Sequence, residues 1–411
     1  MPEKGSKKYT IVLPIATSLS VLILFVPLSS GLFDLVSVIG STESNNTPKK
    51  SVSVEDYDVM KSCTTDRSKK PTSIEYLTFF NCGRVSESQN GQTVREFTLI
   101  ATENQSIEVM DGGYVFKAWT FNGTIPGPTM RVTEGDLVKI TLVNDKNNAR
   151  SHSLHMHSIH SGEMDGVEGK GIVAPGESFT YEFVAQPFGV YPYHCHVSPV
   201  ADHISRGLYG TLIIDPKEPR TQMKELAMMM NGYDFNYDME GPAFIPTVEE
   251  AVNNEMPDVE ERDNELYSVN GKAFDYVNHP IELVAGEEYR IYLVNMLEFD
   301  LVNSIHVHGT MFEYYPSGTS KDPQQVNDIV TLGQGDRGIL ELSYPYPGRY
   351  MFHTHINEFA DKGWMSFFNV SGNSSSSTAI TGSSDSISNT TIIRRNNNNN
   401  NTSDNSYMTH Q

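Results

Sequence analysis

Apolar and polar residues alternate in many short runs along the middle of the chain. Residues 138–144 (VKITLVN) and 289–295 (YRIYLVN) are examples, and such alternation is typical of a strand with one buried face. Proline and glycine separate the runs, and no stretch has the periodicity of a long helix. The pattern predicts an all-β protein of two β-sandwich domains with Greek-key connections.

The region from about residue 91 to 371 contains two copies of one unit. Residues 188–196 (FGVYPYHCH) match residues 347–355 (PGRYMFHTH), and in both copies a glycine stands five residues before the first histidine. The repeat predicts a first domain at 91–216 and a second domain at 222–371.

The segment between the two copies has the composition of a linker. Residues 215–222 (DPKEPRTQ) are polar and contain two prolines. Three methionines follow at 228–230, and we interpret this run as the buried first strand of the second domain rather than as a copper-handling methionine box.

The N-terminus has the pattern of a membrane anchor. Three lysines lie within residues 1–8, and the apolar run at 9–40 carries a single charge, Asp34. Positive residues before an apolar run favour a cytoplasmic N-terminus, and this run is long enough to span a bilayer. We expect an uncleaved anchor, with a cleaved signal peptide as the alternative. In either case the rest of the chain lies outside the cytoplasm.

The cysteines fit this extracytoplasmic setting. Cys63 and Cys82, in an N-terminal extension at 41–90, are close in sequence and have no histidine neighbours. We expect them to form a disulfide, which an oxidising compartment permits, and this leaves Cys195 free.

Two features of composition limit the possible partners and the folded region. Asp and Glu outnumber Lys and Arg by 51 to 30, which gives a formal net charge of −21. Nucleic acid is therefore an unfavourable partner, because binding it depends on neutralising phosphates with Lys and Arg. Residues 372–411 are dominated by Ser, Thr and Asn, a composition that predicts a disordered tail.

Histidine pairs are the strongest chemical signal in the sequence. The chain has 13 histidines, and eight of them form four H-x-H pairs at matching places in the two copies. On a strand, the two residues of such a pair point to the same face about 6.6 Å apart, a separation that suits two neighbouring ions. Imidazole is a ligand for copper and zinc, so the sequence predicts a metal cluster. The pairs are His155/His157, His194/His196, His306/His308 and His353/His355.

Cys195 stands between two of these histidines and points to the opposite face of the strand. On that face it can meet His152 and His203, and one thiolate with two imidazoles is the ligand set of a blue-copper electron-transfer site. Leu208 falls where an axial methionine is usual, and an axial position without a ligand raises the reduction potential. The second copy has lost this set, with Asn303, Thr354 and Lys362 in the matching positions.

These motifs resemble those of the multicopper oxidases, in their two-domain, laccase-like branch, over about residues 91–371. The H-x-x-H-x-H pattern of that family begins at His152, and its H-C-H pattern falls on residues 194–196. The resemblance implies two cupredoxin-type domains and four copper ions per chain, one of type 1, one of type 2 and two of type 3. The implied ligands are His152, Cys195 and His203 for type 1; His155 and His306 for type 2; and His157, His194, His196, His308, His353 and His355 for type 3.

The resemblance also implies an activity and an assembly. A one-electron donor, which the sequence does not identify, would reduce the type 1 copper, and dioxygen would be reduced to two waters at a trinuclear cluster. Protons must reach that cluster, and Asp165 and Glu358 are candidate relays because they lie close to histidine pairs in the sequence. Two-domain relatives form homotrimers with clusters between domain one of one subunit and domain two of the next.

Two other functions stay open. The spacing from Cys195 to His203 is longer than in laccases and resembles that of copper nitrite reductases, which convert nitrite to nitric oxide. Against that function, His155 stands where those enzymes carry a catalytic aspartate, and they lack a histidine at the position of His196. A non-catalytic copper or electron-transfer protein is the third possibility, but it needs no cluster.

Overall fold

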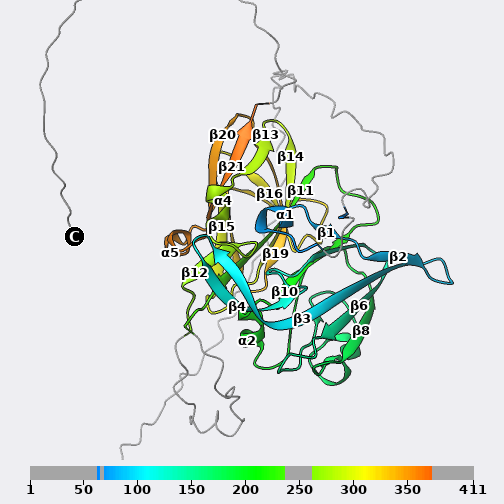
Figure 1. Ribbon diagram of the computed structural model, residues 1–411. Helices are drawn as coiled ribbons and strands as arrows, with labels where there is room; N and C mark the ends of the chain where they lie inside the picture. The colour runs from blue at the N-terminus through cyan, green and yellow to red at the C-terminus, as the bar shows by residue number, and fades with distance from the viewer. Residues whose placement is uncertain (1–62, 65–68, 237–261, 373–411) are drawn as a thin grey trace, which may run out of the picture. The chain divides into compact units, whose positions relative to one another are not determined.

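The computed structural model describes residues 63–64, 69–236 and 262–372 of the 411-residue chain (Figure 1). The predicted anchor at 9–40 and the predicted tail after residue 372 lie outside these ranges. Within them, no helix has both the length and the apolar composition that a membrane span requires.

The first half of the described chain forms two sheets around one core. One sheet has the strand order β1-β5-β10-β9-β7, and the other has the order β2-β3-β6-β8, with β4 paired to β3. In β6, Val138, Ile140 and Leu142 are buried in the core, and the residues between them are partly exposed, as the alternation predicted. The strands are β1 (Phe80–Asn81), β2 (Arg84–Glu87), β3 (Thr93–Met110), β4 (Tyr114–Phe121), β5 (Thr129–Thr133), β6 (Leu137–Asn144), β7 (His155–Met156), β8 (Ser178–Val184), β9 (Gly189–His194) and β10 (Tyr209–Asp215).

The second half repeats this arrangement. Its sheets have the orders β12-β11-β14-β19-β16-β17 and β13-β21-β20-β15-β18. The parallel pair β11 and β14 corresponds to β3 and β6, and the antiparallel pair β20 and β21 corresponds to β9 and β10. The strands are β11 (Lys224–Tyr233), β12 (Leu266–Val269), β13 (Ile281–Val284), β14 (Glu288–Asn295), β15 (Val302–Val307), β16 (Phe312–Pro316), β17 (Gln325–Asn327), β18 (Ile329–Gly333), β19 (Arg337–Ser343), β20 (Gly348–His353) and β21 (Met365–Ser371).

Helices are short throughout the described residues, which agrees with the missing helical periodicity. Together with the two pairs of sheets, they confirm the predicted all-β fold. The α-helices are α1 (Ser73–Tyr76), α2 (Val200–Ser205), α4 (Asp275–Asn278) and α5 (Asn357–Asp361), and the 3-10 helices are η2 (Gly162–Met164) and η3 (Gly169–Gly171).

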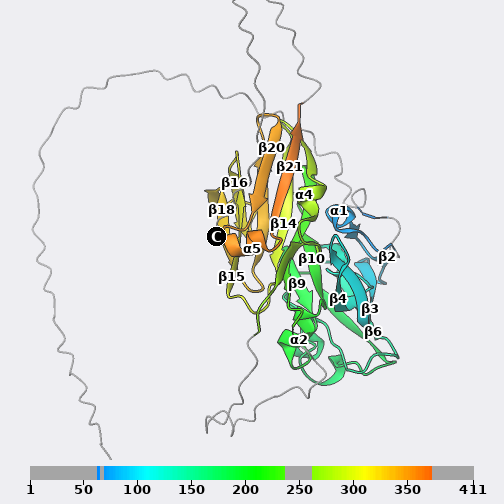
Figure 2. The ribbon, with the colours of Figure 1, turned by 60° about the vertical axis from the view of Figure 1, so that its left-hand side comes forward.

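Strand β14 departs from the predicted half-buried pattern. Every residue of this strand after Glu288 is buried. One face belongs to the core of the second sandwich, whereas Tyr292 and Val294 on the other face join an apolar cluster with Phe80 and Val190 of the first sandwich. Strand β14 lies against β9 of the first sandwich (Figure 2). The prediction of one exposed face is wrong here because that face packs against the other half of the chain.

The methionine run lies in β11, as predicted, and all three side chains are buried. Met228 and Met230 face the core of the second sandwich, and Met229 faces the apolar cluster between the sandwiches. Successive methionines point to opposite faces of the strand, so the run packs against apolar residues on both faces.

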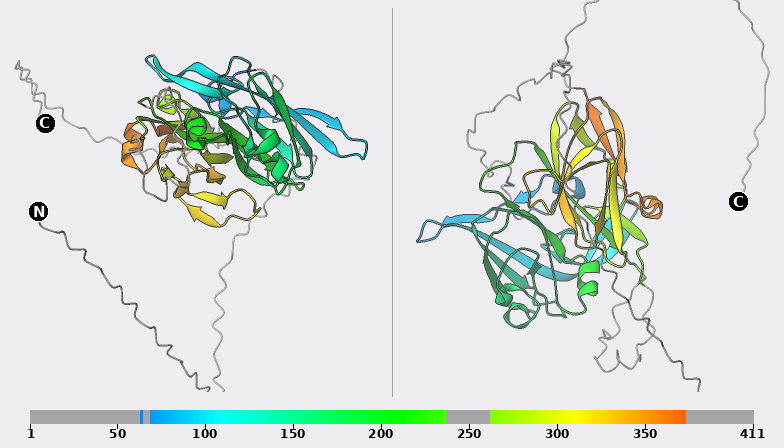
Figure 3. Two further views of the ribbon diagram at one scale, coloured as in Figure 1. Left: turned by 90° about the horizontal axis from the view of Figure 1, so that it is seen from below. Right: turned by 180° about the vertical axis from the view of Figure 1, so that it is seen from behind.

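The described part of the N-terminal extension is built into the first sandwich. The predicted disulfide between Cys63 and Cys82 is present. Strand β1 pairs with β5 and β2 pairs with β3, so the two sheets begin before residue 91. The blue hairpin that projects in both views of Figure 3 contains β2 and the start of β3. The backbone N–H of Ala227 in β11 donates to the carbonyl of Leu77, which ties the extension to the second sandwich as well.

A buried ion-pair network joins the two sandwiches. The Arg131 guanidinium in β5 contacts Asp215 in β10 at 2.7 Å and Glu225 in β11 at 2.6 Å. It also lies 5.1 Å from the ring centre of Phe80 and 5.7 Å from that of Tyr292. Removing one partner from such a network leaves uncompensated charges in a dry environment, which is strongly destabilising.

We therefore expect Arg131→Gln to lower the free energy of unfolding by about 3–5 kcal/mol. The matched control is Lys139→Gln, which removes a half-exposed pair with Glu182 and should cost less than about 1 kcal/mol. Urea unfolding of both variants, followed by circular dichroism, measures the difference. Equal losses in the two variants would contradict the assignment of Arg131 to a buried network.

Candidate metal centres

The predicted cysteine-centred group is assembled in the first sandwich. Cys195 follows β9 and is fully buried. Its Sγ lies 3.1 Å from Nδ1 of His203 and 3.8 Å from Nδ1 of His152, and the two Nδ1 atoms are 3.3 Å apart. One sulfur and two imidazole nitrogens thus converge on one point, although the three residues come from different segments.

Backbone contacts hold these segments together. His152 forms an isolated bridge with Val173, and His203 lies in α2. The N–H of Cys195 donates to the carbonyl of Leu208, which is fully buried in the same core cluster as Cys195. The backbone N–H of Ser153 donates a hydrogen bond to Sγ of Cys195, with the nitrogen 3.3 Å from the sulfur.

The electrostatics of this group favour a thiolate. Burial alone raises the pKa of the Cys195 thiol, but hydrogen bonds to His152 and His203 outweigh it and lower the pKa to about 5. A metal-binding cysteine must be deprotonated, so this group is prepared for a metal. Its donor set, one thiolate and two imidazoles, fits the electron-transfer copper predicted from the sequence.

Trp119 covers the two imidazoles, a contact that the sequence did not predict. Its ring lies edge-on to His203 at 4.9 Å and to His152 at 5.6 Å between ring centres. The guanidinium of Arg150 stacks on Trp119 at 5.0 Å. His152 and His203 are both buried. Trp119 and Arg150 therefore lie between these imidazoles and the solvent on this side.

The four histidines of the two pairs in the first sandwich gather on the other side of Cys195. His155 in β7 stands directly opposite His194 in β9 in the antiparallel register. Nε2 of His157 and Nε2 of His194 face each other at 3.1 Å, and the rings of His155 and His196 are 5.1 Å apart. The two-residue period of a strand thus places Cys195 and its neighbours on opposite faces.

The second sandwich repeats this arrangement. His306 in β15 stands opposite His353 in β20. Nε2 of His308 faces Nε2 of His353 at 3.1 Å, and the rings of His306 and His355 are 5.4 Å apart. Among the described residues, every metal-capable group takes its ligands from one sandwich only.

The ring orientation is fixed in the same way in both sandwiches. Nδ1 of His155 donates to Asp165, and Nδ1 of His306 donates to the carbonyl of Asp328 at 2.9 Å. Nδ1 of His194 and of His353 each donate to the carbonyl of the next residue. With Nδ1 occupied by an oxygen acceptor, Nε2 of each ring is the nitrogen left for a metal. This pattern fits metal-ligating histidines.

Two matching serines support the second histidine of the H-C-H motif and that of the H-T-H motif. The hydroxyl of Ser153 accepts the N–H of His196 at 3.1 Å, and that of Ser304 accepts the N–H of His355 at 2.8 Å. Both serines are buried. The motif alone did not identify them, but their matching positions two residues before His155 and His306 were a usable signal.

The second sandwich has no counterpart of the thiolate group. Thr354, in place of Cys195, is fully buried and lies 3.1 Å from the hydroxyl of Ser304. Asn303 is buried, and Lys362 pairs with Glu358 at 3.0 Å. Hydroxyl, amide and ammonium groups do not provide the soft ligands of a blue-copper site.

The two candidate proton relays have different surroundings. Asp165 accepts a hydrogen bond from Nδ1 of His155 at 2.9 Å, and Nε2 of His160 lies 3.7 Å from the same carboxylate oxygen. Glu358 instead lies on α5 with its side chain 69% exposed and paired with Lys362. Among the described residues, Asp165 therefore contacts a histidine and Glu358 does not. His160 was not among the predicted site residues.

Burial keeps several of these imidazoles neutral. Desolvation lowers the pKa of His157 to about 4 and that of His194 to about 3, and neighbouring histidines add to the effect. It also lowers the pKa values of His155, His308 and His353. Neutral imidazole is the form that binds metals, so these rings are available at neutral pH.

The lowered pKa values predict acid sensitivity of the metal-free protein. Below pH 6.5 an unfolded histidine binds a proton, whereas folded His194 stays neutral down to about pH 3. The unfolded state then binds more protons, so stability falls as the pH falls through this window.

We expect His194→Gln to make the melting temperature of the metal-free protein less dependent on pH between 6.5 and about 3. His279→Gln serves as the control, because the ring of His279 is 54% exposed. Thermal unfolding at several pH values measures both. An unchanged slope for His194→Gln would be evidence against a buried neutral ring.

Known proteins are similar to this chain in sequence and fold. Two family models described as multicopper oxidase match the chain, one over residues 103–219 and the other over 244–374. A crystal structure of a multicopper oxidase has 43% sequence identity and a TM-score of 0.65, and the match covers 73% of this chain and 97% of that one. The copper nitrite reductase from Nitrosomonas europaea has 30% identity and a TM-score of 0.57, over 68% of this chain and 94% of that one.

The chain therefore belongs to the multicopper oxidase family, and its two sandwiches have the cupredoxin fold of that family. The copper-containing nitrite reductase of Neisseria gonorrhoeae is also similar, with 29% identity over 266 residues, or 64% of this chain. That match covers 65% of the Neisseria enzyme, just under two thirds of its length. The relatives are copper oxidoreductases, and they include both oxidases and nitrite reductases.

Proposed function

We propose that this protein is a multicopper oxidase that takes single electrons from a donor and reduces dioxygen to water. The observation that carries the proposal is the set of four histidines in each sandwich, with matching Nδ1 acceptors on the rings that face each other across the strands. A single mononuclear site would leave most of these eight rings without a ligand role.

The residues divide into two kinds of site. Copper bound to them supplies one-electron redox chemistry, the oxidation of a donor coupled to the four-electron reduction of dioxygen to two waters. Leu208 is buried in the same core cluster as Cys195 and would supply no ligand atom to the type 1 site. The proposed type 1 ligands are His152, Cys195 and His203; the type 2 ligands are His155 and His306; and the type 3 ligands are His157, His194, His196, His308, His353 and His355.

Covalent continuity links the two sites in the first sandwich. Cys195 is joined through the backbone to His194 and His196, and their rings project to the opposite face. An electron could therefore pass from the thiolate to the histidine group through covalent bonds alone, without a through-space step. The second sandwich lacks the thiolate and would contribute ligands only.

Asp165 is the residue that we propose to move protons. Its carboxylate accepts from Nδ1 of His155 and is 36% exposed, so it contacts both a proposed ligand and solvent. A carboxylate in this position can take a proton from solvent and hold it beside the histidine group. Glu358 remains a candidate relay only if it meets the histidines of another chain.

A homotrimer would complete the cluster. The described histidines form one group per sandwich, and each group offers the ligands of half a cluster. Joining domain one of one subunit to domain two of the next would bring complementary halves together.

Mixed trimers test this assembly. We expect His157→Gln and His308→Gln to be inactive alone, because each destroys one half of every cluster. In co-expressed trimers about a quarter of the interfaces would pair two intact halves, so about a quarter of wild-type oxygen consumption should return. No recovery in trimers shown by mass spectrometry to contain both chains would contradict an intersubunit cluster.

Nitrite reduction is the second candidate function. The similarity to nitrite reductases of Nitrosomonas and Neisseria favours it, as does the long spacing from Cys195 to His203. His155 and His196 oppose it, because they extend the histidine group beyond a mononuclear site. Nitric oxide release from nitrite under anaerobic conditions, compared with oxygen uptake in air, separates the two activities. A non-catalytic electron carrier would show neither.

The thiolate assignment has its own test. We expect Cys195→Ser to lose the blue colour and to oxidise donors at least about 100-fold more slowly, because a serine hydroxyl is a poor copper ligand. Ser205→Ala on α2 is a control that leaves the proposed ligands in place. Visible absorption and donor oxidation measure the outcome, and a blue Cys195→Ser variant would rule out Cys195 as the type 1 ligand.

Residues 9–40 are proposed to anchor the protein in the cell membrane, with the described part outside the cytoplasm. The disulfide between Cys63 and Cys82 supports an oxidising compartment.

A further inference from the structure

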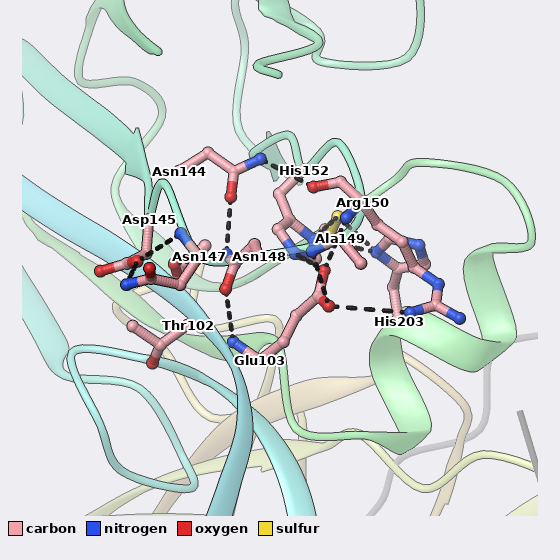
Figure 4. Close-up of polar contacts among 12 residues, drawn as sticks. Thr102, Glu103, Asn144, Asp145, Asn147, Asn148, Ala149, Arg150, His152 and His203 are labelled. Atoms are coloured by element: carbon pink, nitrogen blue, oxygen red, sulfur yellow. Dashed lines mark hydrogen bonds and ion pairs between the residues drawn. The ribbon is translucent and has the colours of Figure 1, made fainter. Parts of the chain in front are cut away.

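Glu103 is a buried carboxylate beside the proposed type 1 site. Its side chain is 2% exposed, and one of its oxygens, Oε1, lies 3.0 Å from Nε2 of His152 (Figure 4). Because a carboxylate accepts hydrogen bonds, Nε2 of His152 is the donor. Nδ1 of His152 is then the nitrogen that faces Cys195 and His203.

The alternation along β3 directs this side chain to the site. Leu99, Ala101 and Glu103 are buried, and the residues between them are more exposed. Leu99 and Ala101 belong to the core cluster that also contains Cys195, so the same face of the strand presents Glu103 to the proposed type 1 site.

The loop before His152 is built around the same carboxylate. The N–H of Ala149 and the N–H of Arg150 both donate to it, at 3.1 and 3.0 Å, and the Arg150 guanidinium lies 3.7 Å away. Asn148 accepts the N–H of Glu103 and donates to the carbonyl of Ala101, which fixes the loop to β3. The carboxylate thus has fixed donors on several sides (Figure 4).

A negative charge in this position has a chemical consequence. It lies on the far side of a proposed ligand ring, where burial limits screening by water. Hydrogen bonding from a ligating histidine to a carboxylate fixes the ring and makes it a stronger electron donor. Both effects stabilise Cu(II) relative to Cu(I), and they oppose the rise in potential that the sequence predicts if Leu208 replaces an axial ligand.

We propose that Glu103 is a positioning residue that fixes the ring of His152 and lowers the reduction potential of copper held by His152, Cys195 and His203. This inference rests on the proposed type 1 site. The second sandwich, in which Asn303 replaces His152, needs no such residue.

The test is the midpoint potential of the type 1 centre in the copper-loaded protein, titrated through its blue absorption band. Glu103→Gln keeps an oxygen for Nε2 of His152 but removes the charge. We expect the ratio of Cu(II) to Cu(I) at a fixed solution potential to fall about tenfold, which corresponds to a rise of about 59 mV for a one-electron couple.

Asn148→Ala is the matched control, because Asn148 holds the same loop without touching a proposed ligand. It should lower the melting temperature and leave the potential unchanged. An unchanged potential in Glu103→Gln, or an equal rise in Asn148→Ala, would overturn the proposal, since the role of Glu103 would then be only structural.

Glu103→Asp covers the case in which Glu103→Gln does not load copper. This variant keeps the negative charge but moves it away from His152 by one methylene group. The ratio of Cu(II) to Cu(I) should therefore fall by less than tenfold, and the midpoint potential should still lie above that of the wild type. A wild-type potential in this variant would also overturn the proposal. If the unmodified protein has no blue band, the proposed type 1 site itself is wrong, and this outcome is distinct from a failure of the role of Glu103.

Discussion

The two-residue period of an extended strand is the constraint on which the candidate site depends. At the end of β9, it sends His194 and His196 to one face and Cys195 to the other. A thiolate group and a histidine group can therefore lie back to back while their members remain neighbours in the chain. The antiparallel register adds His155 opposite His194, and the second sandwich repeats that pairing with His306 and His353.

Burial then determines the protonation states of the two groups. Desolvation disfavours charged imidazoles in the histidine groups, and so it leaves neutral rings for metals. In the cysteine group, the hydrogen bonds to His152 and His203 outweigh desolvation and favour the thiolate. The same dry environment makes Glu103 effective, because a buried carboxylate acts on its neighbours with little screening.

Much of this could be predicted from the sequence, because the repeat and the H-x-H pairs are local patterns. The alternation predicted the all-β fold, the positions of the cysteines predicted the disulfide, and the H-x-H pairs predicted the residues that converge around Cys195 and His155. Contacts between distant segments could not be predicted in this way. The second buried face of β14 depends on packing between the sandwiches, and the contact of Glu103 with His152 joins residues that are 49 positions apart in the chain. Glu358 looked equivalent to Asp165 by its closeness to histidines in sequence, yet it points to solvent.

The copper content per chain of the fully loaded protein tests the central claim most directly. The eight paired histidines and the thiolate group can all act as copper ligands only if each chain binds about four copper ions. Elemental analysis against protein concentration measures this ratio. A value close to four is the predicted result. A value close to two would mean one mononuclear site beside the blue copper, and it would contradict the trinuclear cluster and the reduction of dioxygen there.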